Sequence, residues 1–241
     1  MKLPKLIYPI IFWFLPLVSS AQNFQLHYDL RHTLDPEIQE KNFPMISFEY
    51  FKEFDSLGSF LFKGQTFLNG ENNNLGETFI KVSQSLKFWK PQWYLSLNYS
   101  GGVGTTPTNF GYYINNAYAV GINHPFGWKG AFFSANVQYR YTAFKAPSHD
   151  LQVIFYLWKG MFDYKLVMAG SLVGWTENRN QGTEYTSALT GKKIAFFGDP
   201  QLWLKIKGCF SVGTRINLYY NIFGDKNDLK VYPTIGTQIK F

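Results

Sequence analysis

The chain has 241 residues, of which 46% are hydrophobic, 20% aromatic and 16% charged, and its formal net charge is +7. This composition is too apolar and aromatic for a disordered or collagen-like protein. A mean hydropathy of −0.17 shows that apolar and polar residues are interleaved, which disfavours a helical membrane protein. The single cysteine, Cys209, excludes an internal disulfide and a cysteine-based zinc or iron–sulfur site.

The first element is an export signal. Lys2 and Lys5 precede the apolar run 6–18, and the small residues at 19–21 suit a signal peptidase. We therefore expect a removed signal peptide over 1–21 and one mature domain over 22–241. An uncleaved anchor is the weaker alternative, because the run is short and contains two prolines. No nucleic acid polymer is expected as a partner, because the remaining Lys and Arg are scattered singly.

The first mature segment, 23–32, alternates strictly between apolar and polar residues. The apolar set is Phe24, Leu26, Tyr28 and Leu30, and the polar set is Gln25, His27, Asp29 and Arg31. This two-residue period indicates a strand with one face of each kind. The same period recurs along the chain and predicts about twelve strands, at 23–32, 44–54, 58–69, 77–88, 92–100, 114–123, 131–141, 150–158, 162–175, 193–205, 210–223 and 229–241.

The expected connections alternate in length. Short ones follow even strands, at 55–57, 89–91, 124–130, 159–161 and 206–209. Longer polar ones generally follow odd strands, at 33–43, 70–76, 101–113, 142–149 and 176–192. Bacterial outer-membrane barrels show this asymmetry, with tight periplasmic turns, longer outer loops and both termini in the periplasm. The predicted fold is therefore an all-β transmembrane antiparallel β-barrel of about 12 strands, in the bacterial outer membrane.

The alternative is a secreted soluble β-sandwich or lipocalin-like barrel that binds a ligand, in which the apolar faces point inward. Two features favour the membrane barrel. The polar faces carry bulky ionisable groups beside aromatics, and aromatic clusters stand at strand ends, as at Trp89, Trp93 and Tyr94, or at Phe126 and Trp128. Such clusters suit a membrane interface.

The order of several short stretches resembles the Tsx-type nucleoside-specific channels, and more closely the bacterial outer-membrane family labelled Tsx-like. The matching stretches are Leu26-His27-Tyr28-Asp29, Glu49-Tyr50-Phe51-Lys52, Leu86-Lys87-Phe88-Trp89, Asn98-Tyr99-Ser100-Gly101-Gly102, Asp199-Pro200-Gln201-Leu202-Trp203 and Tyr232-Pro233-Thr234-Ile235. They span nearly the whole mature chain. The resemblance implies a twelve-stranded monomeric barrel whose narrow lumen passes small polar solutes, nucleosides among them.

The polar faces would line the lumen of such a barrel. Aromatic rings suit a nucleobase and hydrogen-bonding groups suit ribose hydroxyls. The alternative is that opposite charges pair across a filled barrel and only brace it, which gives a structural or partner-binding barrel without transport. The candidate lumen-lining residues are Gln25, His27, Asp29, Arg31, Glu49, Glu53, Lys81, Tyr94, Phe132, Gln138, Arg140, Tyr156, Asp199, Gln201, Trp203, Arg215, Asn217 and Tyr219.

An outer-membrane enzyme is the competing functional class. None of the four histidines forms a motif with a serine at a recognisable spacing. His27 and Asp29 supply only two potential metal ligands. We therefore expect no enzymatic activity, no cofactor and no metal. The expected partners are outer-membrane lipid, a small polar solute and the barrel insertion machinery, for which the aromatic Phe241 on the alternating last strand resembles the assembly signal.

Overall fold

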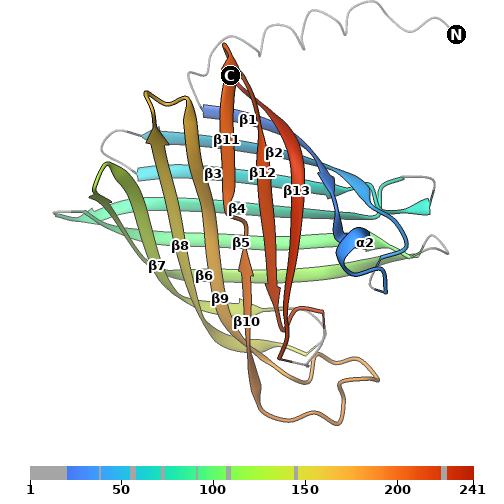
Figure 1. The fold of residues 1–241 in the computed structure, drawn as a ribbon. Helices are drawn as coiled ribbons and strands as arrows, with labels where there is room; N and C mark the ends of the chain where they lie inside the picture. The colour runs from blue at the N-terminus through green and yellow to red at the C-terminus, as the bar shows by residue number, and fades with distance from the viewer. Residues whose placement is uncertain are drawn as a thin grey trace, which may run out of the picture.

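The computed structural model describes residues 21–37, 39–54, 58–71, 74–90, 92–106, 110–143, 146–223 and 227–241. The signal peptide expected over 1–21 lies outside these ranges apart from Ala21, whose backbone opens the first strand. None of the helices in these ranges has the length and apolar content needed to cross a membrane. Figure 1 shows strands wrapped around a central axis, with one short helix at one end.

Antiparallel strands make up most of the described chain, and a single-turn helix, α2 (Arg31–Leu34), follows the first strand. The strands are β1 (Ala21–Asp29), β2 (Phe43–Phe54), β3 (Gly58–Phe67), β4 (Glu77–Trp89), β5 (Trp93–Thr105), β6 (Gly111–Trp128), β7 (Ala131–Thr142), β8 (Ser148–Met161), β9 (Leu166–Asn178), β10 (Lys192–Gly198), β11 (Gln201–Lys207), β12 (Phe210–Tyr220) and β13 (Leu229–Lys240).

The sheet closes on itself. Apart from β10 and β11, strands that are neighbours in sequence pair with each other, and β1 pairs with β13, so that Phe24 lies opposite Ile239. β10 and β11 occupy one position in the ring, because both pair with β9 on one side and β12 on the other. The predicted twelve-stranded antiparallel barrel is confirmed. The single strand expected over 193–205 is wrong in detail, because it breaks at Asp199 and Pro200.

The barrel has two unlike ends. The connections after β2, β4, β6, β8 and β11 meet at one end, which we call the turn end, and those after β1, β3, β5, β7, β9 and β12, with α2, form the loop end. The chain termini of the barrel also lie at the turn end, where the N–H of Phe241 donates to the carbonyl of Gln22 at 3.0 Å. The expected sorting of connections by parity is therefore confirmed.

Several expected boundaries were wrong. β1 ends at Asp29, so Arg31 opens α2 instead of continuing the strand. The connections expected at 124–130 and 159–161 belong largely to β6 and β8. Lys129 and Gly130 make the β6–β7 turn alone, with φ of 48° and 73°, the left-handed conformation that a two-residue hairpin needs. Much of 101–113 is strand as well. Phe241 follows β13, which ends at Lys240.

The outer surface is apolar and the interior is polar, the reverse of a soluble protein. Val137 is 54% exposed and Ile235 is 64% exposed, whereas Asp199, Arg215 and Asn217 have no exposed surface. A soluble sandwich or lipocalin-like barrel would bury its apolar faces. The observed arrangement is the alternation of a membrane barrel, apolar outward and polar inward.

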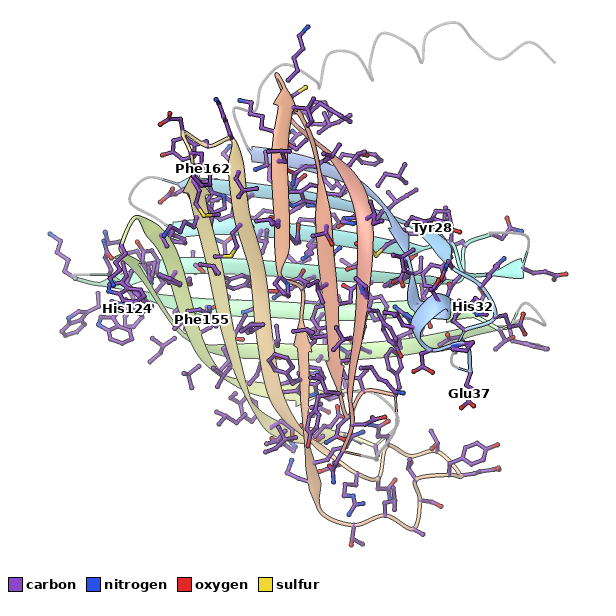
Figure 2. The ribbon with its side chains drawn as sticks, in the orientation of Figure 1. Tyr28, His32, Glu37, His124, Phe155 and Phe162 are labelled. Carbon is purple, nitrogen blue, oxygen red and sulfur yellow. The ribbon has the colours of Figure 1, made fainter. Side chains whose placement is uncertain are left out.

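Two aromatic belts lie on this outer surface. Toward the turn end, the rings of Trp93, His124, Phe126, Phe133 and Phe155 follow one another at centroid distances of 4.7 Å to 6.1 Å. Figure 2 shows His124 and Phe155 on this side and Tyr28 on the other. Toward the loop end lie the rings Tyr99, Tyr118, Tyr139, Tyr141 and His149. Between the belts the register places the aliphatic side chains Leu95, Leu97, Val120, Ile122, Val137 and Val153.

Candidate functional site: the lumen

The described residues enclose a cavity of about 1260 Å³ inside the barrel. Gln22, Lys240 and Phe241 line it at the turn end, whereas Glu177 and Phe223 line it at the loop end. The lining therefore reaches both ends of the barrel. Since these residues come from strands all around the ring, the cavity is the lumen itself and no side pocket.

The candidate residues from the sequence divide into two groups. Those that line the cavity are Arg31, Glu49, Glu53, Lys81, Tyr94, Phe132, Arg140, Tyr156, Asp199, Gln201, Trp203 and Tyr219. Those that point inward but are packed behind other side chains, with at most 2% of their surface exposed, are Gln25, His27, Asp29, Gln138, Arg215 and Asn217. The second group holds the wall together and does not face the open lumen.

The inward faces of β1, β11, β12 and β13 form what we call the filled wall. Gln25 Nε2 donates to Gln201 Oε1 at 3.1 Å, and the indole N–H of Trp203 donates to the same oxygen at 2.9 Å. His27 Nδ1 lies 2.8 Å from Thr234 Oγ1, and its Nε2 lies 3.0 Å from Gln25 Oε1. Large side chains touch one another here, so no lumen remains between them.

The break between β10 and β11 places a carboxylate in the interior. Pro200 has no N–H to donate to a neighbouring strand, and the Asp199 side chain accepts instead from the backbone N–H and the hydroxyl of Ser171, at 2.8 Å and 2.7 Å. The neighbouring Gly170 has φ of 152°, and a Cβ on it would lie 2.7 Å from Pro200 Cα. A glycine is therefore needed where the two strands approach.

Asp199 is the centre of a buried charge cluster. Its Oδ2 accepts from Arg215 Nη2 at 2.9 Å and from Lys63 Nζ, which reaches across the lumen from β3. Arg215 also donates to Gln65 at 3.4 Å, while its Nε and Nη1 have no hydrogen-bond partner within the described ranges. A buried carboxylate is stabilised only when such donors and cations surround it.

A second contact crosses the lumen beside the first. Lys81 Nζ, on β4, donates to the hydroxyl of Tyr156, on β8, at 2.6 Å and lies 4.9 Å from the centre of that ring. Tyr156 is paired with Ser171, which in turn contacts Asp199. The side-chain contacts of both lysines thus lead to neighbouring residues, Tyr156, Ser171 and Asp199, and we call the level of these two crossings the constriction.

The inward faces of β4 to β8 form what we call the open wall. Many of its side chains are small, namely Ser83, Ser85, Ser100, Ala117, Ala119 and Ser134, and all of them line the cavity. Apart from Lys81 and Tyr156, which form the crossing described above, several larger members bond to one another along the wall. Arg140 Nη1 donates to Gln152 at 3.0 Å, Gln152 donates to Gln138 at 2.8 Å, and Gln138 donates to Ser96 at 2.9 Å.

Arg31 stands at the loop end within an aromatic cage. Its guanidinium carbon lies between 4.7 Å and 5.8 Å from the ring centres of Phe43, Phe67, Tyr219, Phe223 and Tyr232. Nη2 also donates to Asp29 at 3.2 Å, and Asp29 accepts the backbone N–H of Arg31 at 2.9 Å. Cation–π contacts and the ion pair therefore hold α2 against the lumen mouth.

The histidines are occupied by structural contacts. Both ring nitrogens of His27 have partners in the filled wall. His32 Nδ1 lies 2.7 Å from the carbonyl of Gln39, and His124 Nδ1 lies 3.1 Å from the carbonyl of Gln92. His149 contacts the Tyr139 hydroxyl on the outer surface. Within the described ranges, no group of three or more His, Cys, Asp or Glu side chains is arranged to hold a metal.

Sequence reasoning missed Lys63, the cation that pairs with Asp199. The face assignment of its strand is ambiguous, because apolar residues occupy both faces: Phe60 and Phe62 point outward, while Leu61 lines the cavity. The sequence feature that indicates the inward face of β3 is the shared spacing of the polar residues Ser59, Lys63 and Gln65, all of which line the cavity. Glu77, Phe79, Trp175 and Glu177 line the cavity and were missed as well.

A comparison with protein-family models matches residues 21–241 to "Domain of unknown function (DUF5020)", and the chain belongs to this family. That description does not mention Tsx-like channels, so the resemblance to them stays a prediction. No curated protein matches the chain.

Among solved structures, a NanC porin superposes with a TM-score of 0.54 at 10% identity, covering 92% of this chain and 100% of that one. A KdgM porin covers 92% of this chain and 99% of that one, with a TM-score of 0.49 at 8% identity. At such identity, the NanC superposition shows a shared barrel fold.

Proposed function

We propose that this member of the DUF5020 family is an outer-membrane channel for the passive uptake of small polar solutes. The observation that carries the proposal is a cavity, lined by charged, polar and aromatic side chains, that reaches both ends of a closed barrel with an apolar outer surface. Lipid contacts the outside, and the two aromatic belts mark the two interfaces of the bilayer.

The proposal includes export and insertion. The segment 1–21 acts as a removed signal peptide, the turn end with both termini faces the periplasm, and the barrel works as a monomer. Phe241 acts as the signal for the insertion machinery. Replacing Phe241 with Asp is expected to slow insertion while export continues, which outer-membrane and periplasmic fractions distinguish; equal outer-membrane amounts of variant and wild type contradict this role.

Nucleosides are the solutes that we propose first. The cavity is lined by the rings of Tyr94, Phe132 and Tyr156 and by amide and hydroxyl groups such as Asn98 and Ser100. Flat rings stack on a nucleobase, and the polar groups bond ribose hydroxyls. The cavity volume of about 1260 Å³ exceeds the roughly 300–1,000 Å³ of typical small-molecule sites, so a nucleoside fits.

Liposome swelling tests the channel. Liposomes that contain the mature protein are expected to swell in solutions of nucleosides, sugars and amino acids, at rates that fall with solute size. Ala119 lines the cavity and Val120 is 42% exposed on the outside, so adjacent residues provide a matched pair. Ala119→Trp is expected to slow swelling because it narrows the lumen, whereas Val120→Trp leaves the rate unchanged.

A barrel without transport is the second candidate, and the packed contacts of the filled wall and the two crossings favour it. In that case a folded, inserted barrel gives no more swelling than empty liposomes. Heat-modifiable migration in gels confirms that the barrel is folded. Stable solubility as a monomer without detergent contradicts both candidates and favours a soluble binding protein. No enzymatic activity is proposed.

A further inference from the structure

The two lysines of the constriction are direct neighbours. Lys63 on β3 lies opposite Lys81 on β4 in the register, and both line the cavity. Like charges directly opposite each other on one face of a sheet destabilise it. Such a pair inside a barrel therefore breaks a local rule of sheet stability, and local rules of this kind are broken mainly at functional sites.

The carboxylates near the constriction do not balance its cations. Asp199 is shared between Lys63 and Arg215, so one carboxylate provides all the ion pairs that the three cations Lys63, Lys81 and Arg215 form within the described ranges. Lys81 has no carboxylate partner within the described ranges, and its contact is the neutral hydroxyl of Tyr156.

The other acidic residues that line the lumen form no ion pair with Lys63 or Lys81 within the described ranges, although Glu49 is adjacent to Lys63 in the register. Glu49 on β2 is the register partner of Lys63 on the side away from Lys81. On the following strands, Glu49 pairs with Asn23 of β1, and Asn23 pairs with Lys240 of β13, toward the turn end. Glu177 pairs with Lys193 at 3.2 Å, and Glu77 accepts from the Tyr112 hydroxyl at 2.9 Å, both at the loop end.

We propose that the constriction is a binding site for an anionic group, so that the channel prefers small solutes that carry a carboxylate or a phosphate. This inference rests on the proposed channel function. It adds an anionic group to the solute, as in the phosphorylated form of a nucleoside. Lys81 Nζ has three donors, and only the contact with Tyr156 uses one of them in the described structure. The hydroxyl of Tyr156 adds a further donor beside it.

The physical basis is the excess positive charge in a confined lumen. Rings of Lys and Arg give pores a preference for anions, and walls of low dielectric constant strengthen the field at a constriction. An anion between Lys63 and Lys81 removes their repulsion. A solute held by one flexible lysine and one hydroxyl also leaves readily, as conduction requires.

The reversal potential in a KCl gradient across a planar bilayer tests the preference. The wild-type channel is expected to be selective for chloride, and Lys81→Met to move the permeability ratio toward unity. Lys87→Met is the matched control, because Lys87 lies on the same strand, is exposed and does not line the cavity. Tyr156→Phe keeps the charge of Lys81 and removes only the hydroxyl donor beside it, so it is expected to lower the chloride preference less than Lys81→Met does.

The outcomes separate the two proposals. A conducting channel that prefers potassium, or one that Lys81→Met and Lys87→Met change equally, overturns the anion site and leaves the channel function standing. A folded barrel without current contradicts the channel function. Inorganic phosphate then tests the site alone in detergent: it is expected to raise the unfolding temperature of the wild type and to bind roughly tenfold more weakly to Lys81→Met. No stabilisation of the wild type overturns the site.

Discussion

The filled wall and the open wall share one pattern of alternation and have opposite consequences. On the filled wall, His27, Trp203 and Arg215 have at most 2% of their surface exposed, because bulky side chains from four strands meet and bond to one another. On the open wall, Ala119 and Ser134 are small, and Phe132 is 49% exposed. Alternation therefore decides which side chains point inward, and their volume decides where the lumen is open.

This comparison predicts that substitutions on the filled wall mainly change stability, whereas substitutions on the open wall mainly change permeation. The largest loss of stability is expected for Asp199→Ala. It leaves Lys63 and Arg215 without their carboxylate, and breaking a buried ion pair typically costs about 3 to 5 kcal/mol. The urea midpoint of the heat-modifiable band measures this loss. Glu184→Ala, at an exposed position of the β9–β10 loop, is the control, and an equal midpoint for both variants contradicts the prediction.

Arg31→Met is expected to change both stability and permeation, because Arg31 lies in the aromatic cage and also lines the cavity. The loss of the ion pair with Asp29 and of the cation–π contacts is expected to cost about 2 to 3 kcal/mol. The same urea titration measures the loss, and single-channel current reports the change at the loop end. Glu37→Ala, an exposed change on the same loop, should leave both readings at their wild-type values.

Tyr94→Leu tests the open wall at the turn end. Tyr94 lines the cavity and is not among the fully buried residues, so the expected change in stability is within about 0.5 kcal/mol. The smaller side chain widens the lumen and is expected to raise the single-channel current. A large drop in the urea midpoint with an unchanged current would mean that this wall, too, is only structural.

The smallest effect is expected outside the barrel, at the loop-end contact of Asp35. Its carboxylate accepts from Lys230 Nζ at 2.7 Å and from the Tyr232 hydroxyl at 3.1 Å. The hydrogen bond from Lys230 holds the pKa of Asp35 below its usual value. A lowered carboxyl pKa contributes stability above the unfolded value, about 3.9, and this contribution is lost as the pH falls through the folded pKa. The difference in stability between wild type and Asp35→Asn, measured against pH, should therefore vanish in acid; a difference that grows there contradicts the assignment.

Much of the fold follows from local patterns in the sequence. The face of each inward residue along β1, β5, β7 and β12 was predicted correctly, because the two-residue period is strict there. The predicted strand boundaries were wrong in two situations. At His124 and Phe126, the alternation continues through residues that were expected to form a turn. At Asp199, a side chain accepts the hydrogen bond that a backbone carbonyl of a continuous strand would accept. The one-turn helix at Arg31 was missed because its residues also fit the alternation.

Less of the site follows from the sequence. The two-residue period indicates which side chains share a face, but the separation of packed residues from lining ones depends on contacts between distant strands. Lys63 and Asp199 are 136 residues apart, and Gln25 and Gln201 are 176 apart. Such pairs depend on barrel closure and on the register of every strand between them, which no local pattern contains.

Single-channel recording in planar bilayers tests the central claim, that the open wall borders a lumen that conducts. The purified, heat-modifiable mature barrel is expected to produce discrete current steps. Ala119→Trp should reduce these steps and Val120→Trp should leave them unchanged, because only the first side chain enters the lumen. A correctly folded and inserted barrel that gives no steps, or equal steps from both variants, would contradict the claim.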